Sequence, residues 1–584
     1  MTKREGRVWL AKLLILTALL VCLVLLVSRE AKLLSAGTEE TAQTVMAENP
    51  LFAAEETEDV AAPEITPEPT AVPDPTPLPD FAPVRSRSDA ITGTKISVNG
   101  VLVDSYAADA AHTMDFAGAE DYTDMKGIIA FRGNNFRNTS QYGLAEIDSR
   151  TFGEHWVQRS GGSTDSYGNY WGGSCWTGQP LVVEWPAQTK RIMNMYDWAK
   201  EKEGLVEVIY ACLDGRVHFI DLETGMETRD SMYLGLAFKG AGALDPRGYP
   251  LLYVGAGLYS EYGQAPRIMI VSLIDGEILY TTGVDDELAP RASWSAFDSS
   301  PLVDAETDQL IYPGENGVIY IEKLNTRYDE AAGTISIDPE EIKFSFTSTT
   351  ADEYYYGMED SALAWRGYLF VADNGADFIC LDLNTLEIVW RFDCLDDTNC
   401  TAVMEVDETG HPYLYLSTSY HLGWRGWDAV TIPVWKIDAV TGQEVWHHDY
   451  ECYSVEGLSG GVEASLSLGK GPLEGIVYVA MARCPNLDNG MLLALDAATG
   501  EEVWTYTSES YAWSSPVCFY DTKGNGYVLY ASAIHGRLYW LDGRDGTVLD
   551  EFPFDCTVEA SPVVYNNTVV IGTRHEEIYG ITLQ

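Results

Sequence analysis

The fold is decided by the stretch Ala494-Leu495-Asp496-Ala497-Ala498-Thr499-Gly500-Glu501-Glu502-Val503-Trp504, because the chain repeats it. Lys436–Trp446 keeps the Asp, the Thr-Gly pair and the Trp at the same offsets. Cys380–Trp390 keeps all of these except the Gly, which is replaced by Leu386. Successive copies start about 40 to 60 residues apart, which is the period of propeller blades or solenoid turns.

Each copy predicts a strand, a tight turn and a second strand. Apolar residues before the turn, such as Met491–Leu495, are typical of half-buried or buried strands. Within the turn, Asp and Thr side chains can accept hydrogen bonds from nearby backbone amides, and Gly supplies a positive φ. The Trp then lies on the next strand, where it can bury against a neighbouring sheet.

This pattern resembles the repeat of the pyrroloquinoline-quinone (PQQ) propeller superfamily, whose blade signature is Ala-x-Asp-x-x-Thr-Gly-x-x-x-Trp. The match is complete at Ala494–Trp504, and the resemblance covers roughly residues 127–584. In that family the Trp docks onto the adjacent blade. The resemblance therefore implies a structural docking role for Trp390, Trp446 and Trp504.

A second landmark, a step of small residues such as Ser299-Ser300-Pro301-Leu302, begins each repeat and gives eight starts. The last module, Glu559–Gln584, is too short for four strands, and Glu154–Val157 reads as a lone strand. We therefore expect an all-β, eight-bladed propeller of four-stranded blades, closed by N- and C-terminal strands. An open solenoid is the rival, but it would need a capping repeat at each end.

The first 30 residues predict a cytoplasmic tip and a transmembrane signal-anchor. Residues 13–27 are apolar and uncharged, and four basic residues precede them. A cleaved signal peptide is the alternative, although no small-residue cleavage site follows directly. An uncleaved anchor would keep the positive N-terminus in the cytoplasm and place the rest outside the cell membrane as a single-pass, extracytoplasmic protein.

Three further regions follow the anchor. Residues 31–90 are acidic and then proline-dense, which predicts a disordered or semi-rigid linker. Residues 91–126 predict a small β-hairpin appendage, because alternating apolar residues surround Asn99-Gly100. Residues 127–584 form the predicted propeller.

Composition limits the partners. The formal net charge is −51, so a nucleic-acid partner is excluded and basic partners are favoured. The ten cysteines show no zinc or haem spacing. Cys394 and Cys400 flank an acidic loop and are candidates for a disulfide, which the sequence leaves open. We expect a monomeric propeller.

Equivalent positions in the eight repeats point to a candidate site. The residue three before each Pro-equivalent is Thr177, Gly240, Asp298, Glu359, Asn399, Glu463, Trp513 or Glu559. In a propeller these positions face the central channel at one rim. Carboxylate and amide oxygens suit Ca²⁺, so the candidate metal ligands are Asp298, Glu359, Asn399, Glu463 and Glu559. Ordinary polar strand boundaries on an acidic protein would give the same pattern.

Aromatic residues lie near the same rim. Trp176, Trp424, Trp427 and Trp513 are candidates for stacking on a sugar or gripping a peptide. Packing between blades is the alternative for each of them. Signatures of nucleophilic catalysis and of phosphate binding are missing from the sequence.

These observations favour a membrane-anchored binding or scaffold module for a cell-envelope protein or glycan. In this respect the chain resembles barrel-assembly propellers, which use PQQ-type repeats without the quinone. The alternative is a PQQ- and Ca²⁺-dependent dehydrogenase of alcohols or sugars. Many such enzymes carry two adjacent cysteines against the cofactor, and this chain has none.

Overall fold

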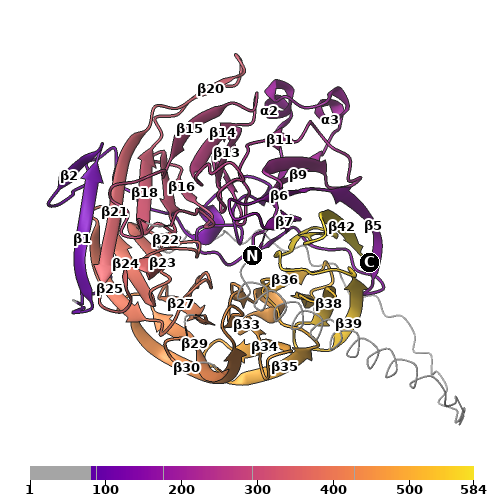
Figure 1. The fold of residues 1–584 in the computed structure, drawn as a ribbon. Helices are drawn as coiled ribbons and strands as arrows, with labels where there is room; N and C mark the ends of the chain where they lie inside the picture. The colour runs from indigo at the N-terminus through magenta and orange to yellow at the C-terminus, as the bar shows by residue number, and fades with distance from the viewer. Residues whose placement is uncertain (1–80, 87, 175, 293, 422, 427) are drawn as a thin grey trace, which may run out of the picture. The chain divides into compact units, whose positions relative to one another are not determined.

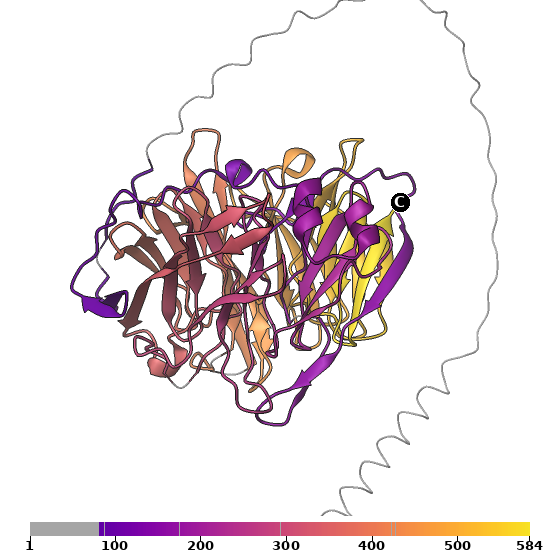
Figure 2. The ribbon, with the colours of Figure 1, turned by 90° about the horizontal axis from the view of Figure 1, so that it is seen from above.

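The computed structural model describes residues 81–584 except positions 87, 175, 293, 422 and 427. Its sheets follow one another around a ring, and eight of them form propeller blades (Figure 1). Seen from the side, the blades form a disc with loops on both faces (Figure 2). The predicted eight-bladed, all-β propeller is therefore confirmed.

The expected membrane anchor, residues 1–30, lies outside the described residues, and so do residues 31–80 of the expected linker. In the part of the chain that is described, no helix has both the length and the apolar character needed to cross a bilayer.

The first four blades run, from inner to outer strand, as follows. Blade 1 has β8 (Leu181–Glu184), β9 (Val206–Ala211), β10 (Arg216–Asp221) and β11 (Met232–Tyr233), with β3 (Gly127–Ile128) inside β8. Blade 2 has β12 (Ala243–Leu244), β13 (Leu251–Gly255), β14 (Ile268–Ser272) and β15 (Ile278–Thr282). Blade 3 has β16 (Leu302–Asp304), β17 (Gln309–Pro313), β18 (Val318–Lys323) and β21 (Glu340–Ser348). Blade 4 has β22 (Leu363–Trp365), β23 (Tyr368–Ala372), β24 (Asp377–Asp382) and β25 (Glu387–Asp393).

The remaining four blades repeat this plan. Blade 5 has β26 (Val403–Val406), β27 (Pro412–Ser417), β29 (Asp428–Asp438) and β30 (Gln443–Ser454). Blade 6 has β32 (Ser467–Leu468), β33 (Ile476–Ala482), β34 (Gly490–Asp496) and β35 (Glu502–Ser508). In the same sheet β31 (Gly460–Gly461) pairs with β33, and β28 (Ser419–Tyr420) pairs with β31. Blade 7 has β36 (Val517–Tyr520), β37 (Gly526–Ser532), β38 (Arg537–Asp542) and β39 (Val548–Pro553). Blade 8 has β40 (Val563–Tyr565), β41 (Thr568–Gly572), β42 (Glu577–Leu583) and β5 (Phe152–Arg159), with β4 (Gln141–Tyr142) parallel to β40.

Few elements lie outside this plan. Besides a hairpin at residues 91–103, they include, in the described chain, the helices α2 (Ala187–Ile192) and α3 (Asp197–Glu201), the hairpins β6 (Gly162–Thr164) with β7 (Tyr170–Gly172) and β19 (Arg327–Asp329) with β20 (Thr334–Ser336), and the 3-10 turns Ala119–Asp121, Glu353–Tyr355 and Gly471–Leu473.

The ring closes through β5, which comes from the start of the propeller and pairs antiparallel with β42 at its end. Trp156 on β5 reaches on into blade 1, where its indole Nε1 donates to the Leu222 carbonyl at 2.8 Å. Closure in this way leaves only short strand edges exposed.

The repeated Asp-x-x-Thr-Gly segment is the turn between the third and fourth strands of a blade. Asp496 Oδ1 accepts from the backbone N–H groups of Ala498 (3.0 Å) and Thr499 (2.8 Å), and Gly500 has φ 74°. A Cβ at Gly500 would lie 2.7 Å from the ring of Trp446 on the preceding blade. Glycine is therefore required both for the turn and for the docked Trp.

The Trp residues on the outer strands dock alike. Their Nε1 groups donate to carbonyls in the next blade's turn, from Trp390 to Ala439 (3.1 Å), from Trp446 to Ala497 (3.2 Å) and from Trp504 to Gly543 (2.9 Å). Each bond joins neighbouring blades around the ring.

The small residues that begin each repeat also form hydrogen bonds between neighbouring blades. The N–H of Ser300 donates to Ser361 Oγ (2.8 Å), and the N–H of Ser361 donates to Thr401 Oγ1 (2.8 Å). The same link joins Ser515 to Ser561 at 3.0 Å. Small hydroxyl residues recur at blade starts because each satisfies a buried amide of the preceding blade.

The segment Phe131–Arg137 fills the centre of the ring. Arg132 and Arg137 are fully buried, and both have positive φ. Their guanidinium groups donate to carbonyls in blades 3, 4, 6 and 7, at Ser300, Ala362, Leu466 and Pro516. These bonds tie four blades to one short segment, which explains two buried arginines without a direct carboxylate partner.

The expected hairpin around Asn99-Gly100 consists of β1 (Ile91–Val98) and β2 (Val101–Val103). β1 pairs with β21 and adds a fifth strand to the outer edge of blade 3 (Figure 1). Part of the expected linker also packs on the propeller. The Phe81 ring lies 4.9 Å from that of Trp365, and the Val84 N–H donates to the Val440 carbonyl at 2.8 Å.

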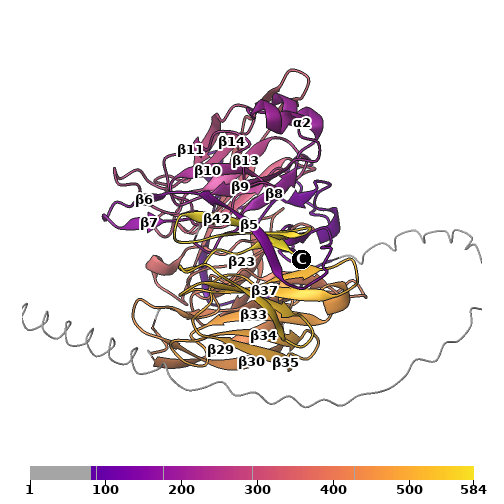
Figure 3. The same ribbon diagram turned by 90° about the vertical axis from the view of Figure 1, so that its right-hand side faces the viewer.

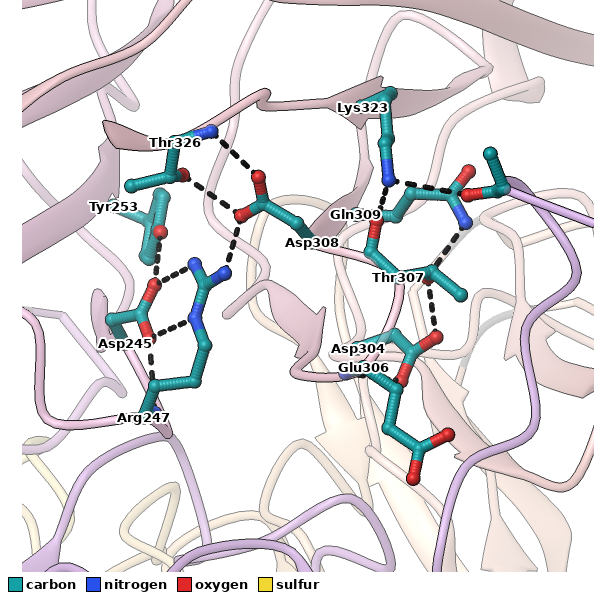
Figure 4. Close-up of polar contacts among 11 residues, drawn as sticks. Asp245, Arg247, Tyr253, Asp304, Glu306, Thr307, Asp308, Gln309, Lys323 and Thr326 are labelled. Atoms are coloured by element: carbon teal, nitrogen blue, oxygen red, sulfur yellow. Dashed lines mark hydrogen bonds and ion pairs between the residues drawn. The ribbon is translucent and has the colours of Figure 1, made fainter. Parts of the chain in front are cut away.

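Blades 2 and 3 are joined by an ion-pair network at the ends of their inner strands (Figure 4). Arg247 donates to Asp245 (2.6 Å) and to Asp308 (2.5 Å), while Tyr253 OH also donates to Asp245 (2.8 Å). Asp308 further accepts from Thr326. Because Asp245 is fully buried, Arg247 is needed to balance its charge.

Candidate functional site

The residues that precede the inner strands gather on the ring axis, where they surround a cavity of about 260 Å³. We call it the axial pocket. It is lined by Trp176, Thr177, Lys239, Asp298, Glu359, Asp397, Asn399, His421, Ser459, Glu463 and Trp513. Apart from His421, which follows β28, these residues come from the starts of successive blades, so ring closure is what creates the pocket.

Four of the five candidate metal ligands line this pocket, namely Asp298, Glu359, Asn399 and Glu463. Glu559 lies apart from the lining. Its carboxylate accepts from Tyr511 OH at 3.0 Å and lies 3.7 Å from Arg574 Nε.

Lys239 supplies a cation to the pocket that the sequence comparison did not identify. Its ammonium forms an ion pair with Asp298 Oδ2 and lies 3.9 Å from Glu359 Oε1. Among the described residues, Asp298 Oδ1 has no hydrogen-bond partner. Lys239 was missed because it stands one position before Gly240, and Gly240 was the residue compared.

Glu315 adds a third carboxylate to this side of the pocket. Oxygens of Asp298, Glu315 and Glu359 lie within 4.8 Å of one another. Glu315 Oε1 accepts from Arg291 at 2.8 Å. Burial, with the Glu359 charge, raises the pKa of Glu315 to about 7, and burial also raises the pKa values of Asp298 and Glu359.

The opposite side of the pocket is a network of amides and carboxylates. Asn374 Nδ2 donates to Asp397 Oδ1 at 2.8 Å, and Asn399 Nδ2 donates to Glu463 Oε2 at 2.9 Å. Burial raises the pKa values of both carboxyl groups. Beside them, His421 Nδ1 and Ser459 Oγ are hydrogen-bonded at 2.5 Å. The pocket therefore offers many more acceptors than positive charges.

Two of the four candidate tryptophans form an aromatic wall. The rings of Trp176 and Trp513 stack at 6.1 Å and 15°, and the Lys239 ammonium lies 5.7 Å from the Trp176 ring. Trp513 Nε1 is buried without a hydrogen-bond partner in the described structure. Trp424 lies outside the lining, is 41% exposed and donates to the Leu395 carbonyl. Trp427 lies outside the described residues.

A tyrosine-bearing hairpin, β6–β7, projects from one face of the disc (Figure 3). Asp165 holds its tip by accepting from the N–H groups of Tyr167 (2.8 Å) and Asn169 (2.9 Å). Tyr167 is 81% exposed. Trp171 at the base of the hairpin lies 4.9 Å from Trp176, so the hairpin leads directly to the axial pocket.

A second exposed tyrosine accompanies it. The N–H of Ser166 donates to the Tyr259 carbonyl, which ties the hairpin to the loop that carries Tyr262. Tyr262 is 88% exposed. We call Tyr167 and Tyr262 the tyrosine rim. The sequence alone did not indicate it, because no periodic pattern marks the two loops as neighbours.

The pocket does not fit PQQ or its Ca²⁺. PQQ is a tricarboxylate, and it would face the carboxylates of Asp298, Glu359 and Glu463 with Lys239 as the single lining lysine. The oxygen cluster suits a hard cation by its chemistry, but the Lys239 ammonium is already bonded within it. Cys394 and Cys400, the pair that the sequence left open, are both buried free thiols in this structure.

Comparison with known proteins agrees with the repeat analysis. Residues 488–584 match the family model of outer membrane protein assembly factor BamB. The chain is 24% identical to a quinohemoprotein alcohol dehydrogenase of Comamonas testosteroni over 219 residues, which is 37% of this chain and 27% of that protein. It is also 24% identical to assembly factor BamB of Kangiella koreensis over 223 residues, or 38% of this chain and 49% of that protein.

The fold is shared with solved quinohemoprotein dehydrogenases. The alcohol dehydrogenase ADHIIG of Pseudomonas putida HK5 is similar with a TM-score of 0.53 and 13% identity, covering 82% of this chain and 83% of that one. The chain spans about a quarter and about half of the lengths of the two curated relatives. The resemblance to PQQ-repeat propellers is thus confirmed, at the level of repeat and fold.

Proposed function

We propose that this protein is a binding or scaffold propeller that takes up a positively charged group of a cell-envelope partner in its axial pocket. The observation that carries the proposal is the excess of carboxylate acceptors over cations around that cavity. Asp298, Glu359, Asp397 and Glu463 face it, against Lys239. A primary ammonium or a guanidinium brings the donors that these acceptors lack.

The aromatic residues extend this site toward a macromolecule. Trp176 and Trp513 offer ring faces next to the carboxylates, where a cation gains from the π system. Asp165 holds the Tyr167 backbone, and Ser166 ties this hairpin to the loop that carries Tyr262, so little loop entropy is lost when a partner docks. A basic segment of a protein fits both features, and an amino-bearing glycan is the second class of partner.

We propose that residues 1–30 anchor the protein in the cell membrane and that residues from Phe81 onward act outside it. The charge pattern of the first 30 residues supports this orientation. The likeness to an assembly factor of the outer membrane supports a scaffold role in the envelope. Selective labelling of intact cells with a membrane-impermeant amine reagent would test the orientation.

A binding experiment tests the pocket. The purified full-length chain is titrated with oligolysine, with deacetylated chitosan oligomers and with their N-acetylated counterparts, by calorimetry. We expect oligolysine to bind and its affinity to fall at least tenfold in Glu463→Gln. Glu551→Gln on the outer strand of blade 7 is the matched control and should bind as the parent chain does.

The pH dependence of that binding has a definite sign. Burial raises the pKa of Glu463 in the pocket and raises the pKa of the adjacent Glu315 to about 7, and a bound cation favours the ionised form of both. Affinity should therefore rise as pH increases from about 5 to 8. Equal affinity of Glu463→Gln and the parent chain for every probe would contradict the proposal.

The second candidate function is a quinone-dependent dehydrogenase, favoured by the shared fold with quinohemoprotein alcohol dehydrogenases. Reconstitution of the full-length chain with PQQ and Ca²⁺, followed by dye-linked oxidation of alcohols and aldoses, decides this point. Because the lining carboxylates repel a tricarboxylate and Lys239 is the single lysine among them, we expect no activity above the chain alone. Oxidation that disappears with a chelator would replace the binding proposal.

A further inference from the structure

Two cysteines that the sequence did not pair meet at the junction of blades 5 and 6. Cys452 lies on the outer strand β30, and Cys484 follows β33. Both are buried free thiols, and burial together with the neighbouring Cys484 raises the pKa of Cys452. In sequence they are far enough apart that only the packing of two blades brings them together.

The backbone holds these two residues in register. The Tyr453 N–H donates to the Arg483 carbonyl at 3.0 Å, directly beside the two cysteines. Cys484 Sγ also lies 3.3 Å from the Glu451 carbonyl, next to Cys452 in the chain. These two contacts place residues 451–453 directly beside residues 483–484, and a disulfide requires two cysteines on such neighbouring backbone segments.

We propose that Cys452 and Cys484 form a disulfide bond that joins blade 5 to blade 6. The bond forms by exchange with a disulfide oxidant, either oxidised glutathione or a protein disulfide. Two S–H bonds and the oxidant's S–S bond are lost, one new S–S bond forms, and two electrons with two protons leave as two thiols on the oxidant. Burial of both sulfurs means that the exchange takes place during folding, before the blades close.

The bond has a consequence for the axial pocket. Arg483 Nε, one residue from the disulfide, donates to the Ser459 carbonyl at 2.8 Å. Ser459 is bonded through its hydroxyl to His421, and both line the pocket. The Arg483 guanidinium also lies 4.5 Å from the Tyr511 ring. The disulfide therefore fixes one wall of the pocket, whatever ligand the pocket takes.

Mass spectrometry tests the bond. The full-length chain is refolded in glutathione buffer, denatured without reductant, alkylated and digested. We expect the peptides carrying Cys452 and Cys484 to be linked, and Cys394, buried but unpaired, to be alkylated. Separate alkylation of Cys452 and Cys484 in the unreduced protein would overturn the proposal, whether or not the pocket binds a cation.

Reduction tests the effect on the pocket wall. Dithiothreitol should lower the Tm of the parent chain and speed amide exchange in residues 455–461 and 483–489. The Cys452→Ser/Cys484→Ser variant should show the lower Tm and the faster exchange with or without reductant. Cys394→Ser is the control and should respond to reductant as the parent does. If mass spectrometry shows the disulfide but its reduction leaves amide exchange in these residues unchanged, the disulfide does not order the pocket wall. The proposal of the bond itself would then still hold.

Discussion

Lys239 forms an ion pair with Asp298 inside the axial pocket, across the junction between blades 2 and 3. The two side chains are 15% and 12% exposed, so little water screens the pair. A second carboxylate, Glu359, lies 3.9 Å from the same ammonium. Lys239 thus occupies the position that a metal ion would need among these oxygens.

Replacing that lysine should convert the cluster into a cation site. We expect Lys239→Met to lose about 3 kcal/mol of stability, because it leaves buried carboxylates without their partner. We further expect Ca²⁺ to raise the Tm of this variant but not that of the parent chain. Thermal unfolding with and without Ca²⁺ checks both points.

The control is Lys126→Met, which removes an exposed pair with Glu184 and should change neither property. A Ca²⁺ shift in the parent chain as large as in Lys239→Met would show that the lysine does not hold the cation position.

Stability should fall as the pH rises toward 8. Glu315 has a pKa raised to about 7 by burial, whereas an unfolded Glu titrates near 4.3. The folded chain therefore binds more protons between these values. Protonated Glu315 therefore contributes on the order of 3 kcal/mol to the free energy of unfolding. This contribution is complete below pH about 4 and is lost as the pH rises through about 7.

Urea unfolding at several pH values measures this slope. Glu315→Gln should flatten it, because the amide cannot ionise, while the exposed Glu551→Gln should not. A slope in Glu315→Gln equal to that of the parent chain would assign the pH dependence to other groups.

The docked tryptophans should contribute more to stability than the exposed one. Trp390 is fully buried and bonded to Ala439, so Trp390→Ala should cost about 3 to 5 kcal/mol. Trp424 is 41% exposed, and Trp424→Ala should cost under about 1 kcal/mol. Chemical denaturation compares them. Similar losses of unfolding free energy in the two variants would mean that docking between blades is not the main contribution of the repeated Trp.

Leu386 departs from the repeat for a reason that can be measured. Its φ of 54° costs about 1 kcal/mol, but it is only 2% exposed, and its burial is worth about 2 to 3 kcal/mol. We expect Leu386→Gly to be destabilising despite relieving the backbone. Leu386→Ala should be worse than Leu386→Gly, because Ala loses the contacts and keeps the strain. The reverse order in urea unfolding would contradict this account.

The repeat made the fold predictable in unusual detail. Asp496, Thr499 and Gly500 encode a local turn, and Trp504 docks on the next blade. The small-residue steps mark the blade starts, and counting them predicted eight blades. The closing strand was expected from the short last module. The end of the linker could not be predicted, because no sequence pattern shows that Phe81 and Val84 contact the blades.

The sequence by itself determined the turns, the ring and the column of residues at its axis, because each of these follows from local, repeated chemistry. The tertiary structure alone decided what that column does. Lys239 enters the pocket from one position outside the column, Glu559 turns away to Tyr511, and Cys452 meets Cys484 across two blades. Such contacts depend on the angle between neighbouring sheets and on the direction of each side chain, and the spacing of a repeat determines neither.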